Sequence, residues 1–208
     1  GIDSTDAHSA LSDSIMTAKV LNIVKKKQPS TWESFFKTAN KSDTETIIKK
    51  GEIITLNEYY YGKSRLHLVA PLHQKYCMHP IYTGWYYAFD LRTDVEPLLN
   101  LSINELKVEM KKSPKFLRTI RSNKAPIIVD AQYGMQAEPY NVMDKSLINK
   151  RADIIKNNEK FSQNILHALR EVAEEKEQSK TQEDIYAEES IYTKFTSNKD
   201  TALFPAWH

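Results

Sequence analysis

The spacing of apolar residues predicts a helix near the start of the chain. Between residues 7 and 27 they recur at intervals of three and four, at Leu11, Ile15, Ala18 and Leu21. This is the period of a helix that buries one face. We expect Asp6 to cap its start and Pro29 to end it. The residues that follow, 30–48, predict a short helix and then an extended segment, with the polar Asn40–Asp43 stretch between them.

The middle of the chain changes to short runs of β-branched and aromatic residues. The runs are 53–55, 66–70, 82–91, 117–120 and 127–129. These residue types favour strands, so we expect a small β-rich domain. Apolar residues at helical spacing over 95–112 predict one helix inserted among the strands.

Past Pro139 the apolar period is again that of a helix, and it predicts an amphipathic helical hairpin. The hairpin is expected to end in the charged tract 174–180, interpreted as a linker. The pattern as a whole predicts an α+β fold.

Composition narrows the class of protein. The 208 residues carry a formal net charge of +2. A basic surface that binds a polyanion must therefore be a local patch and not the whole molecule. One cysteine, Cys77, excludes an internal disulfide framework and favours the reducing cytoplasm. No apolar run approaches the roughly 20 residues of a membrane helix, so we expect no membrane association. The chain begins at Gly1 without an initiator Met, which favours a piece of a longer protein, and without a signal-peptide layout, so we expect no secretion.

His8 and Asp13 are the candidate catalytic residues. They lie five positions apart at the start of the predicted helix, so they occupy adjoining sides of it. A His in such a place can deprotonate a water while an Asp holds a divalent metal ion. The same pair also fits a helix cap and a solvated charge, and the spacing alone leaves both interpretations open.

Several short sequence motifs around this pair occur in a recognisable order along the chain. They are Gly1-Ile2, Ala7-His8-x-Ala10-x-x-Asp13, Thr17-Ala18-Lys19 and Val24-Lys25-x-x-Gln28-Pro29. Together they resemble the third exonuclease motif and exit helix of the bacterial exodeoxyribonuclease I family, which is DnaQ-like.

The resemblance continues downstream. The further matches are Val69-Ala70-Pro71-Leu72, Phe89-Asp90-Leu91, Pro97-Leu98-Leu99, Asn123-Lys124-Ala125-Pro126-Ile127 and Ser190-Ile191-Tyr192-x-x-Phe195. The resemblance implies three parts: the terminal helix of a nuclease domain (1–28), an SH3-like β-barrel domain with an inserted helix (29–178), and a linker with the start of a helical C-terminal domain (179–208).

The family resemblance implies a cytoplasmic, monomeric 3′-to-5′ exonuclease that degrades single-stranded DNA to mononucleotides in repair and recombination. His8 would be its general base and Asp13 one of the acids that bind two Mg²⁺ ions. The other acids would precede Gly1, so we expect residues 1–208 alone to be inactive and to retain no Mg²⁺. The alternative is a non-catalytic module that binds DNA or protein and derives from the same clamp.

Two groups of residues are candidates for DNA contact, because non-specific single-strand binding combines cations with flat side chains. The predicted contacts are Lys50, Lys63, Arg65, Arg121, Asn123 and Lys124. Arg121 and Asn123 are expected on one face of a strand. The tyrosines at 59–61 accompany the first group, although a Tyr run in a strand is commonly half core.

Two partners besides DNA are expected. The family resemblance implies one, and the apolar residues of the first helix imply the other. Family members bind the acidic tail of single-stranded-DNA-binding protein, and Asp130 and Met135 stand where polar or basic groups are expected for that site. The apolar residues of the first helix are expected to pack on the β-rich domain or on a neighbouring chain, so the chain could self-associate.

Overall fold

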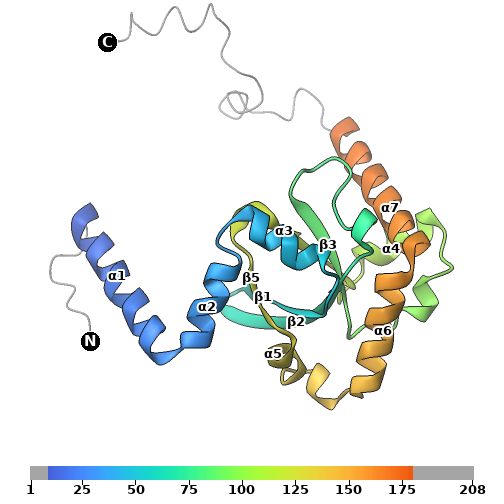
Figure 1. The fold of residues 1–208 in the computed structure, drawn as a ribbon. Helices are drawn as coiled ribbons and strands as arrows, with labels where there is room; N and C mark the ends of the chain where they lie inside the picture. The colour runs from blue at the N-terminus through green and yellow to red at the C-terminus, as the bar shows by residue number, and fades with distance from the viewer. Residues whose placement is uncertain (1–8, 180–208) are drawn as a thin grey trace, which may run out of the picture. The chain divides into compact units, whose positions relative to one another are not determined.

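The computed structural model describes residues 9–179 (Figure 1). The chain divides into two compact units between Arg170 and Glu171. The first unit holds the whole sheet. Its helices are α1 (Ala10–Lys27), α2 (Pro29–Lys37), α3 (Lys41–Lys49), α4 (Ile103–Lys111), α5 (Ala131–Met135), α6 (Lys145–Asn157) and the first part of α7 (Glu159–Gln178). Its strands are β1 (Ile54–Tyr60), β2 (Lys63–Pro71), β3 (Trp85–Asp90), β4 (Leu117–Arg121) and β5 (Ile127–Asp130).

The five strands form one antiparallel sheet in the order β4-β3-β2-β1-β5. A tight hairpin joins β1 to β2, and β5 returns to pair with the other side of β1. Arg118 of β4 forms an ion pair with Glu58 of β1 at 3.0 Å, although two strands separate them. The sheet therefore curves so that the side chains of β4 and β1 meet over one concave face.

Helices cover the sheet through buried apolar side chains. Phe89 of β3 lies against Phe116 and against Phe161 of α7, with ring centroids 5.6 Å and 6.3 Å apart. α5 contacts β1 and β2, α6 contacts β2, and α2 contacts β5. The core accordingly lies between the sheet and these helices.

The α+β class and all five predicted strand runs are confirmed. The inserted helix is present as α4, shorter than expected because Ser102 and Glu105 form a capping box that fixes its start. The helices predicted past Pro139 are present as α6 and α7, but Figure 1 shows α7 running on from the end of α6 instead of folding back along it, so the expected hairpin was wrong. The charged tract expected as a linker is helical as far as Gln178.

The first helix is confirmed over Ala10–Lys27, but its cap and its packing differ from expectation. Ser9 is the cap, because its hydroxyl accepts a hydrogen bond from the Ser12 N–H at 3.1 Å. None of the residues of α1 is buried, so the expected packing on the β-rich domain was wrong. Leu11 and Val20, nine positions and thus about 180° apart on the helix, are both exposed.

Two short elements also correct the expectation. The segment after Asn40 is a helix, α3, because the Asn40 side chain accepts a hydrogen bond from the Asp43 N–H at 2.8 Å and so starts a helix instead of a strand. α5 was not predicted at all, since five residues are too few to show a period. Among the described residues, no helix combines the length and the apolar character that crossing a membrane requires.

Candidate nucleic-acid interface

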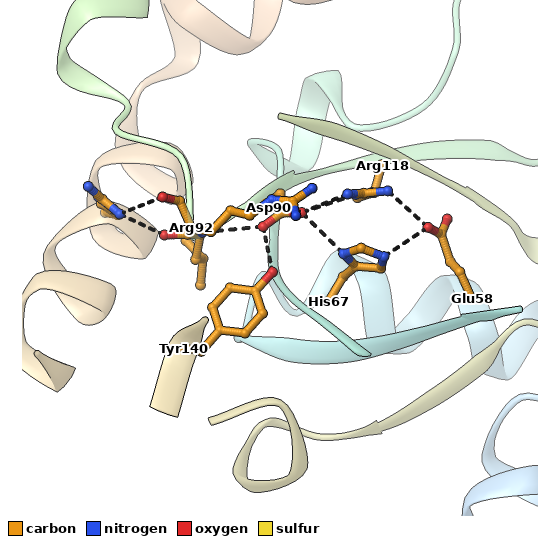
Figure 2. A network of polar contacts seen from close by, with 8 residues as sticks. Glu58, His67, Asp90, Arg92, Arg118 and Tyr140 are labelled. Atoms are coloured by element: carbon orange, nitrogen blue, oxygen red, sulfur yellow. Dashed lines mark hydrogen bonds and ion pairs between the residues drawn. The ribbon is translucent and has the colours of Figure 1, made fainter. Parts of the chain in front are cut away.

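A buried carboxylate organises the polar part of the concave face. Asp90, at the end of β3, has no exposed surface. Arg118 donates to its Oδ2 from Nε and Nη2 at 3.1 Å and 3.0 Å, and the Tyr140 hydroxyl donates to its Oδ1. Arg92 Nε lies 3.2 Å from Oδ2. Figure 2 shows these side chains converging on Asp90.

Glu58 closes the network on the β1 side. Its Oε2 lies 3.0 Å from Arg118 Nη1 and 3.3 Å from His67 Nε2. The other imidazole nitrogen of His67, Nδ1, lies 3.3 Å from Asp90 Oδ2. Two carboxylates and two guanidinium groups thus balance in charge, and the His67 ring lies between the carboxylates (Figure 2).

The network shifts the pKa values of its central groups. Burial alone would raise the pKa of Asp90, but hydrogen bonds from His67 and Tyr140 and the charges of Arg92 and Arg118 outweigh it and lower that pKa. Burial and the neighbouring Asp90 charge raise the pKa of the Tyr140 phenol. Asp90 is therefore a structural anion that holds Arg118 in place.

A hollow of about 380 Å³ opens beside this network, between the two edge strands of the curved sheet and β1. Four cationic side chains line it: Lys115, Arg118, Arg121 and Lys124. Tyr60 and Glu58 of β1 also border it. Cations around a hollow of this kind can hold the phosphates of a polynucleotide.

Arg121 is oriented by an aromatic neighbour. Trp85 is its partner in the β3–β4 pairing, and the Arg121 guanidinium carbon lies 4.2 Å from the centroid of a Trp85 ring. A cation–π contact of this length restricts the side chain without neutralising its charge.

The predicted DNA-binding residues are divided among several places. Arg121 and Lys124 share the hollow just described, but β4 ends at Arg121, so Asn123 lies in the following 3-10 helix and not on the same strand face. Lys63 and Arg65 border a second hollow, of about 510 Å³, with His67 and Arg92.

Lys50 borders a third hollow, beside Asp130. The predicted contacts did not include Lys115 or Arg118, and Tyr60 was named only among the tyrosines that accompany the first group. A charged Arg118 between Leu117 and Thr119 within a predicted strand was the available signal, because an inward-facing charge needs a buried partner.

The predicted catalytic pair is only partly described. His8 lies outside the described residues, and Asp13 is exposed in the first turn of α1. Within residues 9–179, no group of three or more His, Cys, Asp or Glu side chains could together hold a metal ion. The described residues thus do not by themselves fit an Mg²⁺ site.

The chain is similar to known exonucleases over most of its length. It is 28% identical over 175 residues to exodeoxyribonuclease I of Buchnera aphidicola. The alignment covers 77% of this chain and 40% of the Buchnera protein. A solved structure of E. coli exonuclease I in complex with a dA16 oligonucleotide covers 99% of this chain and 45% of its own, with 19% identity and a TM-score of 0.69. The resemblance to exodeoxyribonuclease I is confirmed.

Two further findings qualify the match to exodeoxyribonuclease I. The solved ExoI/SSB-Ct complex covers 99% of this chain and 43% of its own, with 19% identity and a TM-score of 0.64. This chain therefore spans less than half the length of these relatives. No protein-family model matches it.

Proposed function

We propose that the chain is part of a 3′-to-5′ exodeoxyribonuclease acting on single-stranded DNA, and that residues 29–178 hold the DNA strand. The similarity to exodeoxyribonuclease I over 77% of the chain carries this proposal. The cationic hollow supports it, because its guanidinium and ammonium groups match the phosphates of such a substrate.

Within this proposal, His8 is the general base and Asp13 one ligand of the Mg²⁺ ions of the whole enzyme. One carboxylate binds Mg²⁺ poorly, since Mg²⁺ sites usually combine carboxylates with substrate phosphate oxygens. We therefore expect residues 1–208 alone to show no nuclease activity. α1 supports its assignment to a nuclease domain, because it exposes Leu11, Ile15 and Val20, apolar residues that a helix normally packs against the rest of its domain.

A nuclease assay and a binding assay on purified residues 1–208 test the proposal. We expect no Mg²⁺-dependent degradation of single-stranded DNA, but saturable and salt-sensitive binding of it. Arg121→Gln with Lys124→Gln should weaken binding and flatten its salt dependence. Lys145→Gln is the matched control, because Lys145 begins α6 and borders none of the hollows described above.

Two outcomes of these assays would contradict the proposal. Robust degradation that His8→Ala abolishes would overturn the inactivity of these residues alone. A loss of binding equal for Lys145→Gln and for the double variant would mean that the hollow is not the DNA site. Binding without cleavage in the whole natural protein would favour the alternative, a non-catalytic module.

We propose single-stranded-DNA-binding protein as a second partner, through its acidic tail. A hollow of about 370 Å³ offers cationic and apolar groups together, among them Lys160, Leu166 and Arg170, which suits an acidic peptide with apolar residues. Titration with a tail peptide tests this partner, and an absence of saturable binding would count against it. A cytoplasmic location and a monomeric whole enzyme belong to the same proposal.

A further inference from the structure

The turn between β1 and β2 places a tyrosine where the backbone disfavours it. Tyr60 and Lys63 are the last paired residues of the hairpin, so Tyr61 and Gly62 are the two turn residues. Their φ angles are 50° and 76°, the left-handed values of a type I′ turn. Asn or Asp is preferred at the first of these positions, and a bulky side chain there is strained.

The exposure of these tyrosines also lacks an explanation in the fold. Tyr61 is 100% exposed and Tyr59 is 72% exposed. A ring in solvent contributes no burial to stability. A strained and fully exposed aromatic residue at a turn therefore indicates a role outside folding.

Tyr60 connects this turn to the cationic hollow. Side chains alternate along β1, so Tyr60 shares the face of Glu58, whereas Tyr59 lies on the other face. Tyr60 borders the hollow with Arg118 and Arg121 and is 46% exposed. Burial, together with the charge of Glu58 and a hydrogen bond to it, raises the pKa of the Tyr60 phenol. The ring is thus fixed at the rim and partly open to solvent.

We propose that Tyr60 and Tyr61 form a stacking surface for bases of single-stranded DNA whose phosphates lie on Lys115, Arg121 and Lys124. The proposal rests on the proposed function and adds the part of the substrate that this surface recognises. Aromatic side chains beside a cationic groove bind single strands without sequence preference, because every base has a π-face. Paired bases in a duplex present only their edges and do not fit this surface.

Two oligonucleotides separate stacking from phosphate binding. One is an oligothymidylate of about 15 nucleotides, within the range of single-strand sites, and the other is an abasic strand of equal length. Tyr61→Asn should weaken thymidylate binding by about tenfold, the scale of one stacked base, and leave abasic binding unchanged. Its melting temperature should stay level or rise, because Asn suits the turn. Tyr60→Leu should show the same selective loss of affinity.

The matched control is Tyr59→Leu, which changes an exposed tyrosine on the opposite face of β1 and should bind both strands normally. Thymidylate binding unchanged in Tyr60→Leu and Tyr61→Asn, but weakened in Lys124→Gln, would overturn the stacking surface and leave the proposed function standing. Failure of the unmodified chain to bind either strand would overturn both.

Discussion

At the scale of single residues, Asp90 is the residue on which the polar interior depends. A fully buried carboxylate is tolerated only where partners replace its lost hydration, and here two guanidinium groups, an imidazole and a phenol surround it. Because Arg118 reaches from Asp90 to Glu58, the same carboxylate also fixes one cation of the hollow.

Asp90→Asn should therefore destabilise the fold. It removes the anion but leaves the Arg92 and Arg118 charges in place, and an uncompensated buried charge costs about 3–5 kcal/mol. Urea unfolding followed by circular dichroism measures this change in the free energy of unfolding. Asp130→Asn is the control, because Asp130 is 61% exposed and its pair with Lys37 lies at the surface, so its effect should stay below about 1 kcal/mol. Equal effects of the two variants would contradict the role of Asp90.

The lowered pKa of Asp90 also predicts how stability depends on pH. A carboxyl group whose pKa is lower in the folded state stabilises the fold above its unfolded pKa of about 3.9. That contribution is lost as the pH falls through the lowered folded value. The free energy of unfolding should thus fall more steeply below about pH 4 in the unmodified chain than in Asp90→Asn. Parallel pH profiles would show that Asp90 is not the group responsible.

At the scale of elements, local sequence patterns predicted those helices and strands whose formation depends on neighbouring residues. The strands were found because β-branched and aromatic runs mark them. α3 was missed because the cap at Asn40 outweighed the β-branched Ile47 and Ile48. The polar network was not predictable, since its members come from four strands, from Arg92 after β3 and from Tyr140, and no local pattern records which distant side chains meet. Two predicted pairs were placed together correctly, Arg121 with Lys124 and Lys63 with Arg65.

The docking of α5 on β1 depends on one close approach. The Gly134 N–H donates to Thr55 Oγ1 at 3.0 Å, and a Cβ at Gly134 would lie 2.6 Å from that oxygen. Gly134→Ala should push α5 off the sheet and destabilise the fold by about 1–3 kcal/mol, as overpacking does. Thermal or urea unfolding measures it, with Gln132→Ala on the exposed side of α5 as a control expected within about 0.5 kcal/mol of the unmodified chain. An unchanged stability in Gly134→Ala would mean that α5 shifts at no cost.

At the scale of the whole molecule, α1 is the helix that predicts self-association. Its apolar residues Leu11, Ile15 and Val20 are exposed, and exposed apolar surface of this kind favours association. We expect residues 1–208 to associate as concentration rises, and Leu11→Glu with Val20→Glu to reduce this, measured by sedimentation velocity. Glu33→Gln, on the neighbouring helix α2, is the control and should leave association unchanged. A monomer at every concentration would contradict the prediction.

The return of β5 to β1 has a consequence for the order in which the molecule acquires its binding surface. Thr55 and Asp130, joined by a hydrogen bond across that pairing, are 75 positions apart in the chain. Contacts of such long range form late, because closing a long loop costs entropy before any contact compensates for it. The hollow borders β5 as well as β4, so it is completed only when the last strand docks. Single-stranded DNA bound in the hollow would then stabilise the docked β5 and oppose its local opening.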